Sequence, residues 1–140
     1  MITRKHFIAA LALLWGCCSP AWSGEHVVVI GNANVHKIDL DTLQRIYTGK
    51  VVEVDGVHVI PVNASTAMPL RQRFFSQYLQ TDEDQYVAYW TVRRYVGKGT
   101  PPHEVSQKSE MIDFVEHTPG AIGYVDESDV QPGMNVILKR

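Results

Sequence analysis

The sequence predicts an α/β fold, with a mixed central sheet of about four or five strands flanked by helices. Runs of β-branched residues, typical of buried strands, alternate with segments whose apolar residues recur at helical spacing. The 140 residues suffice for one hydrophobic core but are too few for two ordinary domains. No internal repeat, heptad pattern or low-complexity tract interrupts this organisation.

The N-terminal residues 1–23 have the organisation of a secretory signal peptide. Basic residues precede an apolar run over residues 7–15, and small residues favour cleavage after Ser23. The run is too short to cross a bilayer as a helix, which needs about 20 apolar residues. We therefore expect a mature domain over residues 24–140 that is periplasmic or secreted.

Two alternatives for the N-terminus stay open. One is a buried N-terminal helix, against which the Cys-Cys-Ser-Pro break argues. The other is a lipoprotein anchor at Cys17, because residues 14–17 loosely resemble a bacterial lipobox, although Trp15 fits that motif poorly. Cleavage after Ser23 would remove both cysteines, so the mature domain would have no disulfide and would depend on its core for stability.

The first predicted strand covers residues 26–31, a β-branched run suited to burial on both faces. A helix follows over residues 39–50, because its apolar residues fall on one face and Gly49 provides a C-terminal stop. An Asp-Gly turn then introduces a strand over residues 57–62, which ends before Asn63.

Two helices are predicted next. The first begins near Pro69, because proline is favoured at the first helical position and an apolar stripe follows at helical spacing. The second begins at Asp82, whose acidic surroundings suit the positive end of the helix dipole, and it ends at the loop over residues 97–102. The two prolines of that loop are expected to open a further helix over residues 104–116.

The stretch HTPGAIGYV predicts a helix end, a turn and a core strand. Pro119 stops the helix, Gly120 supplies the turn, and residues 121–125 form a short buried strand. Because Gly123 has no side chain, we expect another backbone or a ligand to come close there. A last strand is predicted over residues 134–138.

The predicted core draws one or more apolar residues from each of these segments. Its members are Val28, Ile30, Leu43, Ile46, Val59, Phe74, Trp90, Ile112, Val115, Ile122 and Val125.

The sequence offers no catalytic or metal site. Its two Gly-Lys pairs lack the flanking residues of a phosphate-binding P-loop, its histidines lack metal-ligand spacing, and it has no nucleophile-elbow motif. Its formal net charge is −2 and no basic run survives removal of residues 1–23, so nucleic acid is not an expected partner. We expect no enzyme activity, no cofactor and no transmembrane span in the mature chain.

The most informative segment is the polar loop before the helix at Pro69. A strand-to-helix turn directs free backbone N–H groups to the positive end of the helix dipole, which favours an anion. Arg71 could add a bidentate contact to a phosphate or carboxylate. The predicted ligand-binding residues are therefore Asn63, Ser65, Thr66 and Arg71. The alternative is that Ser65 or Thr66 only caps the helix and that Arg71 pairs with a surface acid.

Several stretches occur in an order that resembles a known family: IYTGK, DGVHVIPVN, RQRFF, Trp90, GKGTPP and the run over residues 111–125. The family is the PstS-like, phosphate-binding branch of periplasmic substrate-binding proteins, in particular its short single-lobe phosphate ABC transporter substrate-binding proteins. The resemblance covers about residues 26–138. It implies a single periplasmic-binding-protein-like lobe, in which residues 121–125 return the chain to the central sheet.

The chain departs from the family in two respects. Full-length members enclose phosphate between two lobes, and this chain resembles the second lobe only. Their phosphate loop reads Arg, a few residues, then Ser-Gly-Thr, whereas residues 63–66 here contain neither arginine nor glycine.

The resemblance implies an exported solute-binding protein that binds phosphate or a similar small anion. Its expected partners are that anion and an ABC transporter or other envelope protein, and a homo-oligomer stays open. The alternative function is a non-enzymatic protein-interaction or accessory module of an envelope system, which keeps the lobe fold without binding a ligand.

Overall fold

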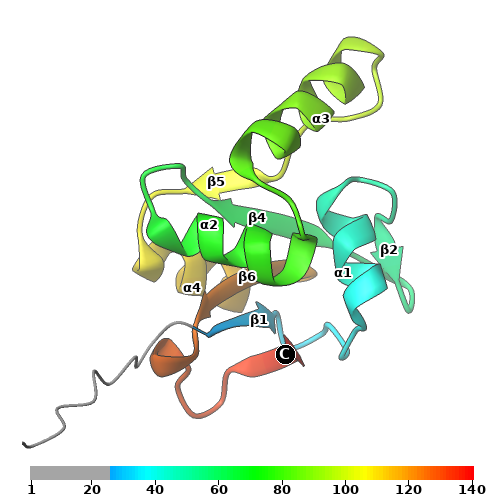
Figure 1. Cartoon of the computed structure of the whole chain (residues 1–140). Helices are drawn as coiled ribbons and strands as arrows, with labels where there is room; N and C mark the ends of the chain where they lie inside the picture. Colours follow the sequence, from blue (N-terminus) through cyan, green and yellow to red (C-terminus); the bar gives the residue numbers. More distant parts are fainter. Residues whose placement is uncertain (1–25) are drawn as a thin grey trace, which may run out of the picture.

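The structure, a computed structural model, describes residues 26–140. The predicted signal peptide and Cys17 lie outside the described residues. In chain order the elements (Figure 1) are β1 (Val27–Gly31), α1 (Leu40–Tyr47), β2 (Glu53–Val54), β3 (Val57–His58), β4 (Ile60–Ala64), α2 (Pro69–Phe74), the π-helix η1 (Phe75–Leu79), α3 (Glu83–Tyr95), β5 (His103–Val105), α4 (Lys108–His117), β6 (Ala121–Asp126), the 3-10 turn η2 (Glu127–Asp129) and β7 (Asn135–Lys139).

The main sheet has five strands in the order β5-β4-β6-β1-β7. Strand β4 runs parallel to both β5 and β6, whereas β1 runs antiparallel to both β6 and β7. Strands β2 and β3 form a separate two-stranded hairpin. The prediction of an α/β fold with a mixed sheet of this size is therefore confirmed.

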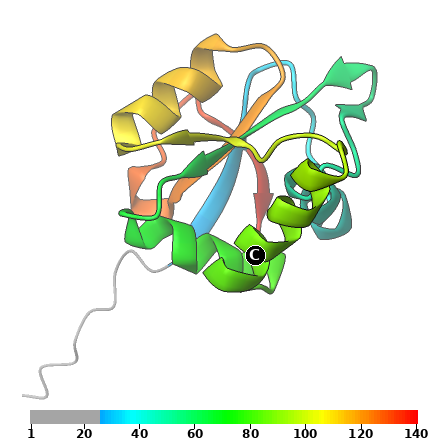
Figure 2. The same cartoon turned by 90° about the horizontal axis from the view of Figure 1, so that it is seen from above.

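Helices cover both faces of the sheet, with α2 on one side and α4 on the other (Figure 2). Two residues of strand β6 illustrate the packing on the two faces of the sheet. The Tyr124 ring stacks on Phe74 of α2, with centroids 3.8 Å apart and planes 8° apart. On the other face a Cβ at Gly123 would lie 2.6 Å from Met111 Sδ and 2.9 Å from Val115 Cγ2. The close approach predicted at Gly123 thus comes from side chains of α4, and the expectation of a backbone or ligand there was wrong.

The predicted core is confirmed at every position but one, since Ile112 is only half-buried. A group of aromatic residues fills the space between the sheet and the helices α1 and α2. Tyr47 of α1 meets Phe74 edge to face at 4.9 Å, and its hydroxyl donates to the Val62 carbonyl oxygen of β4 at 2.8 Å. This layer fixes the position of α2 over β4.

The turn before β6 requires glycine. Gly120 has a φ of +80°, and a Cβ there would lie 2.0 Å from the His58 carbonyl oxygen. The helix end, turn and strand predicted for this stretch are confirmed, with α4 ending at His117 and β6 beginning at Ala121.

Two predicted elements were wrong in part. The strand expected over residues 57–62 is divided, because β3 pairs with β2 whereas β4 joins the main sheet. The helix expected over residues 104–116 begins only at Lys108, and the segment after the two prolines is strand β5. The chain after the prolines is extended because it pairs with β4 at the edge of the sheet.

Candidate functional site

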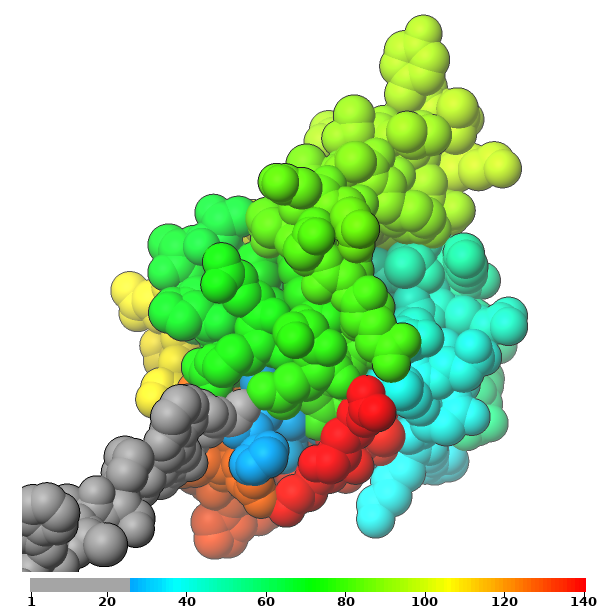
Figure 3. All heavy atoms as spheres, viewed as in Figure 1, coloured from blue at the N-terminus to red at the C-terminus, as the bar shows by residue number. Residues whose placement is uncertain are grey.

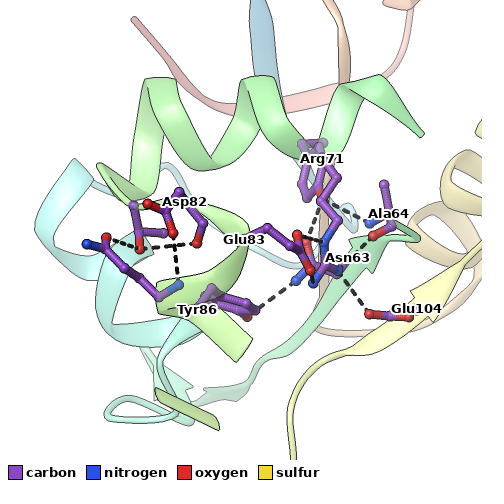
Figure 4. Close-up of polar contacts among 10 residues, drawn as sticks. Asn63, Ala64, Arg71, Asp82, Glu83, Tyr86 and Glu104 are labelled. Atoms are coloured by element: carbon purple, nitrogen blue, oxygen red, sulfur yellow. Dashed lines mark hydrogen bonds and ion pairs between the residues drawn. The ribbon is translucent and has the colours of Figure 1, made fainter. Parts of the chain in front are cut away.

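Arg71 of α2 is buried, with 3% of its surface exposed, and lies at the centre of an ion-pair cluster (Figure 4). Its Nε donates to Glu83 Oε2 at 2.7 Å and its Nη2 to Glu83 Oε1 at 2.9 Å. Its Nη1 donates to Glu104 Oε1 and to the Ala64 carbonyl oxygen, each at 2.9 Å. The Phe75 ring lies 4.7 Å below the guanidinium carbon. Arg71 is therefore paired with two acids, as the alternative interpretation of this residue expected.

The two glutamates also control the charge state of Arg71. Burial alone would lower the pKa of Arg71, but the hydrogen bonds and charge of Glu83, together with the charge of Glu104, raise it above its usual value. The guanidinium is thus permanently charged. With two carboxylates around one cation, the cluster carries a net negative charge at neutral pH.

Asn63, at the carboxyl end of β4, is buried in a network of tyrosine hydroxyls. Its Oδ1 accepts from the Tyr124 hydroxyl at 2.5 Å, and its Nδ2 donates to the Tyr86 hydroxyl at 3.3 Å. The Tyr124 oxygen accepts from the backbone N–H of Ala64 at 2.9 Å. Burial raises the pKa of Tyr86 and of Tyr124, so both hydroxyls keep their protons and act as donors at neutral pH.

Ser65 and Thr66 lie in the turn that joins β4 to α2. The Ser65 N–H donates to the Val105 carbonyl oxygen of β5 at 2.8 Å, and the Ser65 carbonyl oxygen accepts from Met68 N–H at 3.0 Å. The N-cap of α2 is Met68, which makes no side-chain capping bond, so the expectation that Ser65 or Thr66 caps the helix was wrong. Thr66 and Ala67 are exposed, and their N–H groups have no acceptor among residues 26–140.

The structure therefore divides the four predicted residues into two pairs. Asn63 and Arg71 belong to the buried network, whereas Ser65 is half-buried and Thr66 is exposed in the turn. A contact of any of the four with a ligand stays a prediction.

A pocket of about 120 Å³ lies beside the buried network, between α3 and β5. Arg71, Arg94 and Glu104 supply its charges. Trp90, only 5% exposed, also lines it, and its indole N–H has no hydrogen-bond partner within the described part of the chain. The full lining is Asn63, Arg71, Tyr86, Val87, Trp90, Thr91, Arg94, Pro101, Pro102 and Glu104.

The sequence did not identify four members of this network: Tyr86, Glu83, Glu104 and Tyr124. Glu83 was assigned to the acidic first turn of a helix, and Glu104 to a helix that proved to be β5. A buried arginine needs a counter-charge, and this need is the signal that could have pointed to the two glutamates, though not to the two tyrosines.

In the part of the chain that the structure describes, no cluster of three or more His, Cys, Asp or Glu side chains could hold a metal ion. None of the helices over residues 26–140 has the length and apolar character needed to cross a membrane.

The described residues form one α/β fold with a mixed five-stranded main sheet. Two solved structures share it. One is an ABC-type phosphate transport receptor from Vibrio cholerae, with a TM-score of 0.61 and 16% identity over 80% of this chain and 45% of the receptor chain. The other is a putative phosphate ABC transporter substrate-binding protein with bound phosphate from Clostridium perfringens, with a TM-score of 0.56 and 17% identity over 80% of this chain and 44% of that one.

The resemblance to phosphate receptors is thus confirmed for the fold. The chain spans less than half the length of either receptor chain. No family model and no curated protein matches the sequence.

Proposed function

We propose that the protein is an exported solute-binding protein of the phosphate-receptor kind. It binds phosphate or a similar small anion at the turn between β4 and α2, and it works with an ABC transporter or another envelope protein. The fold that it shares with two phosphate receptors supports this assignment. The observation that carries the proposal is the place of the turn in the sheet.

The turn lies where ligands collect in open α/β sheets. Strands β4 and β5 are parallel neighbours, so their carboxyl ends meet at the same edge of the sheet. From β4 the chain continues into α2 on one face, and from β5 it continues into α4 on the other face. In open α/β sheets, the carboxyl ends of adjacent strands that diverge in this way are the usual ligand position.

The groups in the turn suit a small anion. The N–H groups of Thr66 and Ala67 are unpaired among the described residues, and the hydroxyls of Ser65 and Thr66 lie beside them. They precede α2 and η1, whose dipoles favour negative charge at this end.

Arg71 stabilises the start of the turn by donating a hydrogen bond to the Ala64 carbonyl oxygen. Glu83 and Glu104 accept from three of its other four N–H donors, and their negative charge weakens the attraction of the site for an anion. We therefore expect weaker binding than an unpaired arginine would give.

The test is a titration of the folded protein with phosphate and with sulfate, followed by calorimetry and by NMR shifts of the Thr66 and Ala67 amides. The double variant Ser65→Ala/Thr66→Ala should lose binding. Glu104→Gln should strengthen it, because one negative charge beside the turn is removed. Ser76→Ala, which removes an exposed hydroxyl on η1, is the matched control and should bind as the wild type does. A folded protein that gives no response to millimolar phosphate would refute the proposal.

A further inference from the structure

Helix α3 is attached to the rest of the molecule along one side only. Tyr86 and Trp90 are its buried residues, each 5% exposed. The Tyr89 hydroxyl donates to the Thr48 carbonyl oxygen at 2.6 Å, and Arg93 Nη2 donates to the Gly49 carbonyl oxygen at 3.3 Å. Beyond these contacts the helix projects from the body of the protein (Figures 1 and 3).

The opposite side of α3 is also apolar. Among residues 26–140 five large hydrophobic side chains are exposed, and four of them belong to α3 or to its C-cap: Val87 (48%), Val92 (64%), Tyr95 (92%) and Val96 (55%). The small residues Ala88 and Thr91 lie between them and are exposed as well. Helices that are apolar on both sides are usually buried on both sides, so we expect a partner to cover the outer side of α3.

The outer side is continuous along the helix. At 100° per residue, Asp84, Ala88, Thr91 and Tyr95 lie within a narrow stripe, because they are spaced by three or four residues. Val87 and Val92 flank this stripe on its two sides. A second helix could therefore lie against α3 over its whole length, with the small residues Ala88 and Thr91 allowing close approach at the middle.

The stripe can pack against the same stripe of a second copy of α3 that runs in the opposite direction. If a second α3 lies antiparallel with a twofold axis between Ala88 and Thr91, then Ala88 faces the second copy's Thr91. The same axis places Val87 beside the second copy's Thr91 and Val92 beside its Ala88, because each pair lies on the same side of the stripe. It also places Asp84 beside the second copy's Tyr95. Each contact then occurs twice, as a symmetric dimer interface requires.

The charges of the helix favour the same arrangement. Its first turn is acidic and its last turn is basic, so antiparallel copies bring opposite charges together whereas parallel copies bring like charges together. Asp84 and Arg94 form no ion pair among the described residues, whereas Glu83 is engaged by Arg71. Asp84 of one copy and Arg94 of the other are thus free to pair across the interface.

From these observations we propose that α3 is a homodimerisation helix, which pairs antiparallel with α3 of a second copy of this chain through Val87, Ala88, Thr91, Val92 and Tyr95. The surface lies away from the contacts of α3 with Thr48 and Gly49. At one edge, Val87 and Thr91 also line the pocket between α3 and β5. The proposal does not depend on anion binding at the turn.

The first test is sedimentation equilibrium of the purified protein, expressed from the full chain, over a wide concentration range. We expect a monomer–dimer equilibrium. Val92→Glu should raise the dimer dissociation constant about tenfold or more, because it buries an unpaired charge. Val52→Glu is the matched control, since Val52 is equally exposed (59%) but lies outside α3, and it should leave the equilibrium unchanged. A protein that is monomeric at every concentration, or a dimer that Val92→Glu leaves intact, would overturn the proposal.

The second test determines the orientation of the two helices. With Cys17 and Cys18 replaced by serine, Ala88→Cys/Thr91→Cys should form intermolecular disulfides under mild oxidation. Asp84→Cys alone should not, because in an antiparallel pair its two copies are about eleven residues apart along the axis, or about 16 Å. Efficient disulfide formation by Asp84→Cys would indicate a parallel pair and contradict the proposal.

Discussion

Arg71 of α2 and Glu83 of α3 are joined by two parallel hydrogen bonds, 2.7 and 2.9 Å long. The arginine side chain is 4% exposed and that of the glutamate 30%. Since Glu104 of β5 binds the same guanidinium, one cation connects two helices and the edge strand.

We expect Glu83→Gln to destabilise the protein more than Glu104→Gln. Glu83 is the more buried partner and makes both bidentate bonds, so its replacement leaves a buried guanidinium poorly paired, at a cost of about 1–3 kcal/mol. Glu104 is half-exposed, and its replacement should cost about 0–1 kcal/mol. Urea unfolding measures both. Glu53→Gln, at an exposed position of β2, serves as the control. Equal losses for all three variants would contradict the central role of Glu83.

Tyr124→Phe should destabilise the protein by about 1–3 kcal/mol. The change removes the hydroxyl that donates to Asn63 Oδ1 and accepts from Ala64 N–H, and it leaves both groups buried without that partner. Tyr95→Phe, which removes a hydroxyl from a residue that is 92% exposed, provides the comparison in the same unfolding assay. If the two variants are equally stable, the hydroxyl network contributes nothing to the fold.

Gly123→Ala should destabilise the protein by about 1–3 kcal/mol, because the new methyl group would press on α4. The added Cβ would lie 2.6 Å from Met111 Sδ. In a Met111→Ala background the same substitution should cost less, since the sulfur is gone and only the contact with Val115 Cγ2, at 2.9 Å, remains. A double-mutant cycle by chemical denaturation checks this coupling. Additive effects on the free energy of unfolding would show that the Met111 side chain moves aside without destabilising the protein.

Stability should fall in acid through Asp39, the N-cap of α1. Its carboxylate accepts from Thr42 N–H at 2.8 Å. Hydrogen bonding from the Thr42 side chain, and then from its backbone N–H, lowers the pKa of Asp39 below the ordinary value of 3.8. A lowered pKa in the folded state means that the stabilisation is fully present above pH 3.8 and is lost as the pH falls through the lower folded value. Asp39→Asn keeps a capping group but does not titrate. The difference in unfolding free energy between wild type and Asp39→Asn should therefore be constant above that pH and change below it. A difference that is constant down to pH 2 would disprove the assignment.

The alternation of strands and helices was predictable because it depends on local patterns. The run at β1, the capped stripe of α1 and the Pro119-Gly120 turn each carry their signal within a few residues. Strand β5 does not. It has three residues, and its extended state depends on pairing with β4, which lies about forty residues earlier in the chain.

The candidate site was predictable only as a segment. Residues 63–66 and Arg71 are adjacent in the sequence, so their place at the start of α2 followed from local signals. The partners of Arg71 come from α3 and β5, and their approach depends on the path of the chain back across the sheet. No local sequence pattern distinguishes an arginine that binds a ligand from one that forms ion pairs with two glutamates distant in the sequence.

The position of β1 between β6 and β7 determines when this chain can fold. Both sheet neighbours of β1 lie about ninety residues or more further along the chain, so β1 is unpaired on both edges until β6 and β7 have been synthesised. Pairings over such long separations form slowly, because the intervening loop must close first. The sheet is therefore assembled late, after β6 and β7 are available, and a shortened chain that lacks these two strands would leave a strand of five buried residues open to aggregation.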